Sequence, residues 1–316
     1  MITSSKFEII RNATNLDNNV LSIAKMCELA KVSRSGYYEW LTAEPYRQRH
    51  EESDRADFER ILEAYKYRGY AKGARSIYMR LLHTDVVMNL KKIRRLMHKY
   101  GLKCPYRGPN PYRQMAKALK TNTVFPNKVN RKFLAGSVRK VLLTDITYIF
   151  YDKGVCYLST ILDAFTREIL AYELSESLEV SFVLKTVANL VKQHGSTLDD
   201  TTIVHSDQGC HYTSKAFIKA LRDNNFIQSM SRKGNCWDNA PQESFFGHMK
   251  DEIKYEIAMM KSFSNVKIKI DDWIDYYNND RYQWDLVKLS PKEYYGYVAT
   301  GIYPLKTWGS APNPEV

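Results

Sequence analysis

Residues 141 to 150 read Val-Leu-Leu-Thr-Asp-Ile-Thr-Tyr-Ile-Phe, a run rich in β-branched and aromatic residues and free of glycine and proline. Such a run is typical of a central β-strand. It carries one carboxylate, Asp145, and burying an ionised acid in a strand costs several kcal/mol unless a cation or hydrogen bonds compensate. The pattern therefore predicts that Asp145 is either capped by its neighbours or bound to a metal ion.

Two further acids occur where a site is expected. Asp207 directly follows the strand-like run 202–206, and the Gln-Gly pair after it stops the strand; α/β sheets place their chemistry at strand ends. Glu243 comes two residues after Pro241, which suits the first turn of a helix. Lys250 lies seven residues after Glu243 and, at about 3.6 residues per turn, falls on the same face. The helix thus presents an acid and a base together.

The spacing of these residues resembles that of a known catalytic core. Asp207 and Glu243 are separated by 35 residues, and with Asp145 and Lys250 they resemble the D,D(35)E constellation of retroviral-type integrases. Three longer motifs resemble the second-frame transposase of bacterial insertion sequence family three, in the same order and along nearly the whole chain. They are His-Ser-Asp-Gln-Gly at 205–209, Ser-Arg-Lys-Gly-Asn-Cys-Trp-Asp-Asn-Ala-Pro at 231–241 and Tyr-Asn-Asn-Asp-Arg at 277–281.

The resemblance implies an α/β (α+β) fold, a ribonuclease-H-like core with a mixed five-stranded sheet, preceded by an all-α helix-turn-helix region. In that fold the first and fourth strands lie side by side, which brings Asp145 and Asp207 together. It also implies a transposase that binds the terminal inverted repeats of its element, cleaves a DNA strand with water, and joins the freed 3′ hydroxyl to another phosphate. Many relatives carry a histidine two residues after the arginine of the last motif, whereas residues 281–284 here read Arg-Tyr-Gln-Trp.

The three acids suit magnesium, a hard cation that takes oxygen ligands and keeps several waters, with manganese as a substitute. The spacing alone indicates only a metal site, and without the resemblance three separated acids are more often solvated surface residues. In the scheme that the resemblance implies, two ions about 4 Å apart serve an in-line phosphoryl displacement. Asp145 would bridge both ions, and Asp207 and Glu243 would each hold one.

Other potential ligands receive a structural interpretation. His205, Cys210 and His211 lie close to the second acid in sequence, but nothing elsewhere supplies ligands at zinc spacing, so we expect the histidines to hydrogen-bond the backbone. Asp163 lies near a strand end, and we interpret it as a turn or cap residue. The five cysteines are scattered, with no C-x-x-C pair, which argues against a disulfide framework or a zinc finger.

The net charge of +12 is concentrated in the first part of the chain. Residues 1–140 contain 29 Lys and Arg against 12 Asp and Glu, whereas residues 141–316 contain 18 against 23. Residues 66–140 carry 20 basic residues and a single acid, Asp85. A short charge run is usually a solvated face, but a segment this basic repels itself without a polyanion. We therefore expect DNA or RNA as its partner.

Residues 20–41 predict a helix-turn-helix, with an apolar stripe on the first helix and Ser33 as the cap of the second. In that interpretation Arg34, Ser35 and Tyr38 approach DNA. The alternative is a helical pair that only packs, and the resemblance favours DNA.

A second basic helix is expected over residues 89–100, followed by Gly101 as a C-terminal cap. Its apolar residues face inward, which leaves five basic residues, including Lys99, for the other side; four of them are predicted DNA contacts: Lys91, Lys92, Arg94 and Arg95. The alternative is a basic face turned to solvent.

Three residues around the helix of the third acid are also candidates for DNA binding. We expect Lys250 to contact the phosphate of the DNA end, with an ion pair to Asp251 or Glu252 as the alternative. Trp237 and Asn239, in the loop before the helix, either position DNA or cap and pack.

The chain divides into five expected segments. They are a helix-turn-helix-like region (1–52), a second helical basic DNA-binding region (53–103), a proline-containing basic linker (104–137), the integrase catalytic core with C-terminal helices (138–298) and a flexible tail (299–316). No run of 18 apolar residues and no signal-peptide core occur. We therefore expect a cytoplasmic bacterial protein without a membrane partner, associated with the nucleoid when bound to DNA.

The expected partner is double-stranded DNA, both element ends and target, bound by a homo-oligomer. Members of the family are often completed by fusion to an upstream reading frame, so this chain is expected to be the catalytic part. Two alternatives to the transposase are a catalytically inactive DNA-binding regulator and a nuclease without strand transfer.

Overall fold

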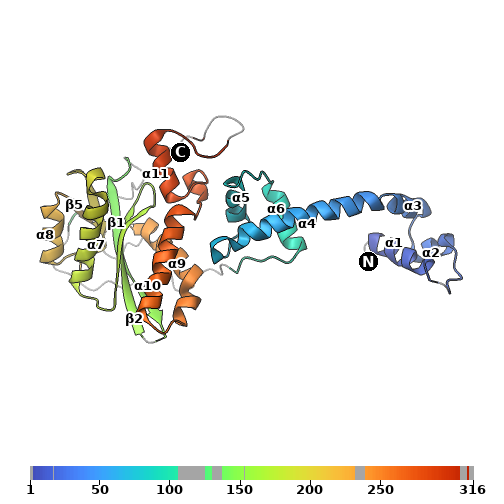
Figure 1. Cartoon of the computed structure of the whole chain (residues 1–316), viewed down its shortest axis with the longest axis horizontal. Coiled ribbons are helices and arrows are strands. Elements are labelled where there is room, and N and C mark those ends of the chain that lie inside the picture. The colour runs from blue at the N-terminus through green and yellow to red at the C-terminus, as the bar shows by residue number, and fades with distance from the viewer. Residues whose placement is uncertain are drawn as a thin grey trace.

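The computed structural model describes residues 3–16, 18–105, 125–129, 137–152, 154–231, 239–306 and 312. These residues form a sheet covered by helices, and a helical arm that extends away from it (Figure 1). The helices are α1 (Thr3–Thr14), α2 (Ile23–Ala30), α3 (Arg34–Thr42), α4 (Glu44–Lys66), α5 (Ala74–Leu82), α6 (Leu90–Lys99), α7 (Val180–His194), α8 (Lys215–Asp223), α9 (Ala240–Ala258), α10 (Phe263–Asn279) and α11 (Pro291–Thr300). The strands are β1 (Val141–Tyr151), β2 (Gly154–Asp163), β3 (Ile169–Ser175), β4 (Ile203–Ser206) and β5 (Ile227–Met230).

The sheet has the strand order β3-β2-β1-β4-β5. The first three strands pair antiparallel, and β4 and β5 add to β1 in parallel. The mixed five-stranded sheet is thus confirmed, as is the prediction that the first and fourth strands lie side by side.

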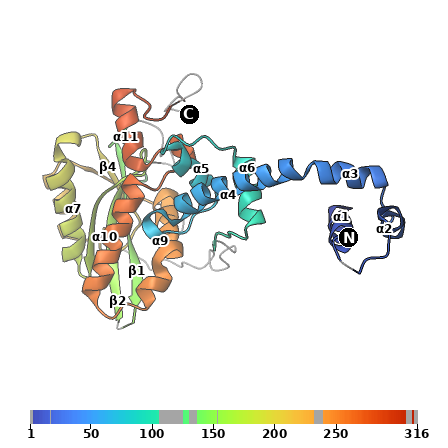
Figure 2. The same cartoon turned by 45° about the vertical axis from the view of Figure 1, so that its right-hand side comes forward.

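Side chains of β1 alternate between two cores because successive residues of a strand point to opposite faces. Leu143 packs with Phe245 of α9 and Trp273 of α10, whereas Leu142 packs with Val187 of α7. Figure 2 shows α9 and α10 on one side of the sheet and α7 on the other. Two helical layers therefore enclose the strands that carry the first two acids.

The aromatic residues of α10 belong to the core. Trp273 is 0% exposed, Tyr276 4% and Tyr277 3%, so none of them offers a ring for base stacking. Ser262 caps the helix by accepting a hydrogen bond from the Asn265 backbone, which fits a helix start after a serine.

The helical arm differs from expectation at two places. The helix α4 begins at Glu44 and runs unbroken to Lys66, across the expected segment boundary between residues 52 and 53, because Pro45 suits a first turn and nothing after it breaks a helix. No helix was predicted over residues 3–14, where α1 packs Phe7 against Tyr37 of α3. Both views show α4 carrying α1, α2 and α3 away from the sheet.

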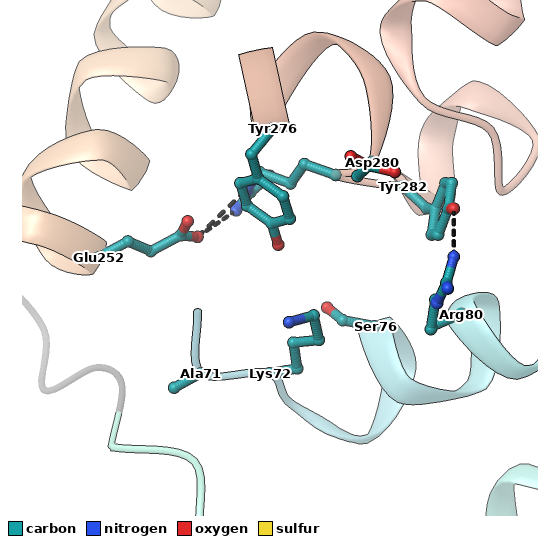
Figure 3. A pocket seen from close by; sticks show the side chains of 9 residues that line it. Ala71, Lys72, Ser76, Arg80, Glu252, Tyr276, Asp280 and Tyr282 are labelled. Carbon is teal, nitrogen blue, oxygen red and sulfur yellow. Dashed lines mark hydrogen bonds and ion pairs between the residues drawn. The ribbon is translucent and has the colours of Figure 1, made fainter. Parts of the chain in front are cut away.

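The arm is held to α10 by ion pairs. Arg68, in the short turn Tyr67–Gly69 after α4, lies within ion-pair distance of Asp272 and Asp280, at 3.7 and 3.2 Å, and also pairs with Asp275. The junction encloses a cavity of about 20 Å³ lined by residues of both parts (Figure 3), which has room for about one water molecule. It is therefore a packed contact rather than a ligand site.

The predicted linker (104–137) and tail (299–316) lie largely outside the described residues, and the five segment boundaries stay predictions. In the part of the chain that the structure describes, no helix is both long and apolar enough to span a membrane.

Candidate active site

Asp145 lies on β1, and Asp207 directly follows the last residue of the neighbouring strand β4. Leu143 of β1 pairs with His205 of β4 in the parallel ladder, and each acid lies two residues further along its own chain. A step of two residues keeps a side chain on the same face, and neighbouring strands are about 4.8 Å apart. The strand order thus brings the first two acids to one place on the face that α9 covers.

Each of these carboxylates accepts a backbone hydrogen bond. The Asp145 Oδ1 atom accepts from the Ile146 N–H at 2.7 Å, and the Asp207 Oδ1 atom accepts from the Gly209 N–H at 2.8 Å. A Cβ atom at position 209 would lie 2.9 Å from Asp207 Oδ1, which explains the glycine after the second acid. The caps expected from the sequence are present but leave most carboxylate oxygen lone pairs available.

The first turn of α9 is attached to the sheet beside Asp145. Pro241 stands at the start of the helix, as predicted. The side-chain amide of Gln242 donates a hydrogen bond to Thr160 Oγ1, and Thr160 is the register partner of Asp145 across β1 and β2. Glu243, the next residue, is exposed. Gln242 was not predicted as a site residue. The sequence signal that could have identified it is its position directly before Glu243.

The carboxylates repel one another. The pKa of Asp145 is raised to about 7, mainly by burial and also by the negative charges of Asp207 and Glu243. Burial also raises the pKa of Asp207. Within the described residues no three His, Cys, Asp or Glu side chains are grouped closely enough to hold a metal ion as they stand. The third acid therefore acts on the first electrostatically, without completing a cluster.

Lys250 is the cation of this site. Desolvation lowers the pKa of the Lys250 ammonium, and the Asp145 carboxylate opposes that shift. The alternative partner Glu252 is occupied, because its carboxylate accepts hydrogen bonds from the Arg281 guanidinium at 2.9 and 3.0 Å and from Trp273 Nε1 at 3.0 Å. Lys250 interacts electrostatically with Asp145, and the Arg281–Glu252 pair joins α9 to the residues after α10.

The remaining ligand-type residues near Asp207 have structural partners. Both ring nitrogens of His205 lie within hydrogen-bond distance of serine hydroxyls, at 2.9 and 3.0 Å, and His211 Nε2 lies 2.7 Å from the Leu178 carbonyl oxygen. Asp163 is fully buried and accepts hydrogen bonds from the Thr166 hydroxyl and the Phe165 N–H. Its predicted role in the turn is confirmed.

Comparison with known proteins identifies the family. An integrase core domain matches residues 137–236 and another matches residues 225–291, while an HTH-like domain matches residues 52–110. The catalytic core domain of BIV integrase aligns with a TM-score of 0.40 and 13% identity, over 52% of this chain and 97% of that one.

Relatives of known sequence are closer. An uncharacterized transposase-like protein of Haemophilus influenzae is 35% identical, over 67% of this chain and 95% of its own length. A transposase for insertion sequence element IS904 of Lactococcus lactis is 33% identical, over 71% of this chain and 87% of its own length. The chain belongs to the transposases of insertion sequence family three. Membership makes it an enzyme of the polynucleotidyl transferase class and confirms the expected ribonuclease-H-like core.

The first predicted DNA-contacting group of this transposase lies on α3. Ser33 caps the helix by accepting from the Gly36 N–H at 3.0 Å, as predicted. Arg34, Ser35 and Tyr38 are all exposed on the two turns that follow. The HTH-like match covers residues 52–110, which contain α5 and α6 rather than this helix.

The second predicted group, on α6, divides into two kinds of residue. Lys91 and Arg94 are exposed. Arg95 forms a two-pronged ion pair with the buried carboxylate of Asp54, at 2.6 and 2.7 Å, and Lys92 pairs with Asp57. The acids belong to α4, about 40 residues earlier, so their proximity was invisible in the pattern of α6.

Of the two candidate DNA-binding residues in the loop before α9, the structure describes one. Trp237 lies outside the described residues. Asn239 is 5% exposed and precedes α9 without making a side-chain cap hydrogen bond, so it does not cap the helix. Its buried Oδ1 atom has no hydrogen-bond partner in the described parts of the chain.

Proposed function

We propose that this transposase binds the terminal inverted repeats of its insertion sequence, cleaves a DNA strand there, and joins the freed end to a second DNA site. The catalytic residues would be Asp145, Asp207 and Glu243. The observation that supports this proposal is that Asp145 on β1 and Asp207 just beyond β4 each lie two residues after the paired residues Leu143 and His205, with the first turn of α9 attached beside Asp145.

The chemistry of these side chains fits a divalent cation. All three offer carboxylate oxygens, the donors that Mg²⁺ and Mn²⁺ take. Burial and the two neighbouring carboxylates raise the pKa of Asp145, which means that its ionised form is disfavoured. A bound cation would stabilise that ionised form. When bound, two such ions would supply electrostatic stabilisation to the attacking and leaving oxygens of a phosphoryl transfer. Because the three acids are not yet grouped, binding requires their side chains to move.

The chain's own groups would hold the DNA. Lys250 interacts electrostatically with Asp145 and is positioned for a phosphate near the acids. On the arm, Arg34, Ser35 and Tyr38 of α3 would approach one duplex segment. Lys91, Lys92, Arg94 and Arg95 of α6 lie on a second basic surface, where Lys91 and Arg94 would make the phosphate contacts and the other two would hold α4. Trp237 and Asn239 would position the DNA from the loop before α9.

The assembly is part of the proposal. DNA ends and target must be held together for joining, and we expect a homo-oligomer on double-stranded DNA to do this. Fusion to an upstream-frame product would add DNA-binding elements. Nucleoid association would follow from DNA binding.

A cleavage and joining assay tests the function. A labelled duplex that carries the element end is incubated with Mg²⁺ or Mn²⁺ and either the unaltered protein, Glu243→Gln or Glu256→Gln. Glu256 lies on the same helix and pairs with Lys269 at 2.7 Å, so its substitution is a matched control. We expect cleaved and joined products from the unaltered protein and the control, and bound but intact DNA from Glu243→Gln. Binding without cleavage by every protein would indicate a regulator, and cleavage without joining a nuclease.

A further inference from the structure

A groove lies between the outer half of β1 and α9, next to the acid site. Its volume is about 460 Å³, within the range of about 300–1,000 Å³ typical of small-ligand sites. Ile149, Met249 and Ile253 are among its apolar lining residues. The groove is thus large enough for a group the size of a nucleobase and offers it an apolar surface.

The groove exists because β4 is short. The parallel ladder between β1 and β4 ends at Leu143, whereas β1 continues to Tyr151 with β2 on its other side. Among the described residues no strand covers this outer half of β1 on the β4 side, and α9 runs alongside it (Figure 2). The open edge therefore begins at Thr144, the residue before Asp145, and runs past it to Tyr151.

Three aromatic side chains at the groove are exposed. Tyr148 is 47% exposed, Phe150 70% and Tyr255 73%. A group of exposed aromatic residues around one hollow is unusual on a soluble surface and marks a binding site. Their flat faces suit another flat ring.

The charge of the groove is positive. Lys250 and Lys254 both line it and lie four residues apart on α9, which places them on one face of the helix. The Lys254 ammonium lies 4.9 Å from the centre of the Tyr255 ring, and Lys250 interacts electrostatically with Asp145. Since residues 141–316 are acidic overall, two lysines beside an apolar hollow indicate a partner that carries anions as well as flat rings.

We propose that this groove binds unpaired nucleotides of DNA beside the reacting phosphate. Their bases would stack on Tyr148, Phe150 and Tyr255, and their phosphates would contact Lys250 and Lys254. Bases in a duplex are already stacked on one another, so only frayed or single-stranded nucleotides present free faces. Because every base has such a face, this contact is tolerant of sequence. The inference rests on the proposed function and specifies which part of the DNA lies next to the acids.

A binding experiment without metal tests the groove separately from catalysis. The full chain is titrated against fluorescent oligothymidylate and against two element-end duplexes, one fully paired and one with unpaired terminal nucleotides. Tyr255→Ala and Phe150→Ala are compared with Ile268→Ala, which removes a 67% exposed side chain of α10 outside the groove. Loss of one stacking contact is expected to weaken binding of oligothymidylate and of the unpaired end by about tenfold. The paired end and the control should be unchanged.

Three results would overturn the proposal. The first is that both groove variants bind oligothymidylate and the unpaired end as tightly as the unaltered protein does. The second is that the variants lose as much affinity for the paired end as for the unpaired end. The third is a change in the oligomeric state of the groove variants, measured by sedimentation, relative to the unaltered protein. Such a change would show that a second copy of the chain covers the groove. Oligothymidylate binding by Glu243→Gln separates the groove proposal from the proposed catalytic function. If this variant still binds oligothymidylate and the unaltered protein does not cleave DNA, the groove proposal holds and the catalytic proposal fails.

Discussion

Asp145 and Asp207 are related by the sheet itself, since each lies two residues beyond the paired positions Leu143 and His205. The relationship depends on strand order, because β1 and β4 are separated by two antiparallel strands and α7 in the chain. Two acids that are 62 positions apart in the sequence thus reach one place. Burial is the main cause of the raised pKa of Asp145, and the nearby charge of Asp207 adds to it.

The stability of the metal-free protein should fall as the pH rises through the range in which Asp145 ionises. Its pKa in the folded state is raised to about 7, above the ordinary value of 3.8. The folded state therefore holds a proton that the unfolded chain releases, and stability is lost between about pH 4 and about pH 7. At about 1.4 kcal/mol per pKa unit, the effect is a few kcal/mol. Urea unfolding below and above this range measures it.

Asp145→Asn supplies the matched comparison, because it keeps the shape of the side chain and removes its titration. The loss of stability across the same range should shrink in this variant. An equally steep loss with and without the carboxyl group would mean that Asp145 is not the group responsible.

Removal of the Arg281 side chain should destabilise the attachment of α9. Its guanidinium is bonded to Glu252, whose side chain is only 9% exposed. A buried carboxylate left without its cation costs about 3–5 kcal/mol, which chemical denaturation of Arg281→Ala would show. Lys269→Ala is the control, because the Glu256 carboxylate of that pair is 51% exposed and such pairs contribute less than about 1 kcal/mol. Equal losses in both variants would contradict the role of the buried pair.

The neighbouring arginines of α6 should have separable effects. Arg94→Ala should weaken DNA binding regardless of sequence and reduce the salt dependence by about one counterion, with folding unchanged. Arg95→Ala should lower thermal stability, because Asp54 is 2% exposed and would lose its two-pronged partner. Affinity at several salt concentrations and thermal unfolding of both variants check this. The reverse assignment of the two effects would refute the division.

The contact between the arm and α10 should depend on Arg68. Arg68→Glu replaces its ion pairs with Asp272, Asp275 and Asp280 by repulsion, and we expect faster amide exchange in α5 and at the end of α10. Arg60→Glu alters an exposed residue of α4, paired with Asp57 at 3.6 Å, and should leave α10 unaffected. Unchanged exchange in Arg68→Glu would show that apolar contacts hold the arm.

Much of the core followed from local patterns. The strand β1 was predicted from its β-branched and aromatic run, and the start of α9 from Pro241. These patterns sufficed because burial on two faces dictates residue type at each position. The start of α4 was missed because residues 44–52 are mostly polar. They form no apolar stripe from which a helix could have been predicted.

Contacts between distant segments were not readable from the sequence. The motif that contains Arg281 was recognised, but not its partner Glu252 on α9. Lys92 and Arg95 were predicted as free basic residues because their acidic partners lie on another helix. Phe150 was interpreted only as a strand residue, since its exposure follows from where β4 ends. In each case, the deciding fact is which element packs beside the residue.

Strand transfer from a pre-cleaved element end tests the central claim most directly, because it needs the acid site but not the first cut. The unaltered protein, Asp207→Asn and Asp223→Asn, an exposed α8 residue, are each incubated with this end, target DNA and Mg²⁺ or Mn²⁺. We predict joined products with the unaltered protein and Asp223→Asn, and none with Asp207→Asn although it still binds the end. Joined products from Asp207→Asn at the unaltered level would contradict the assignment of this site.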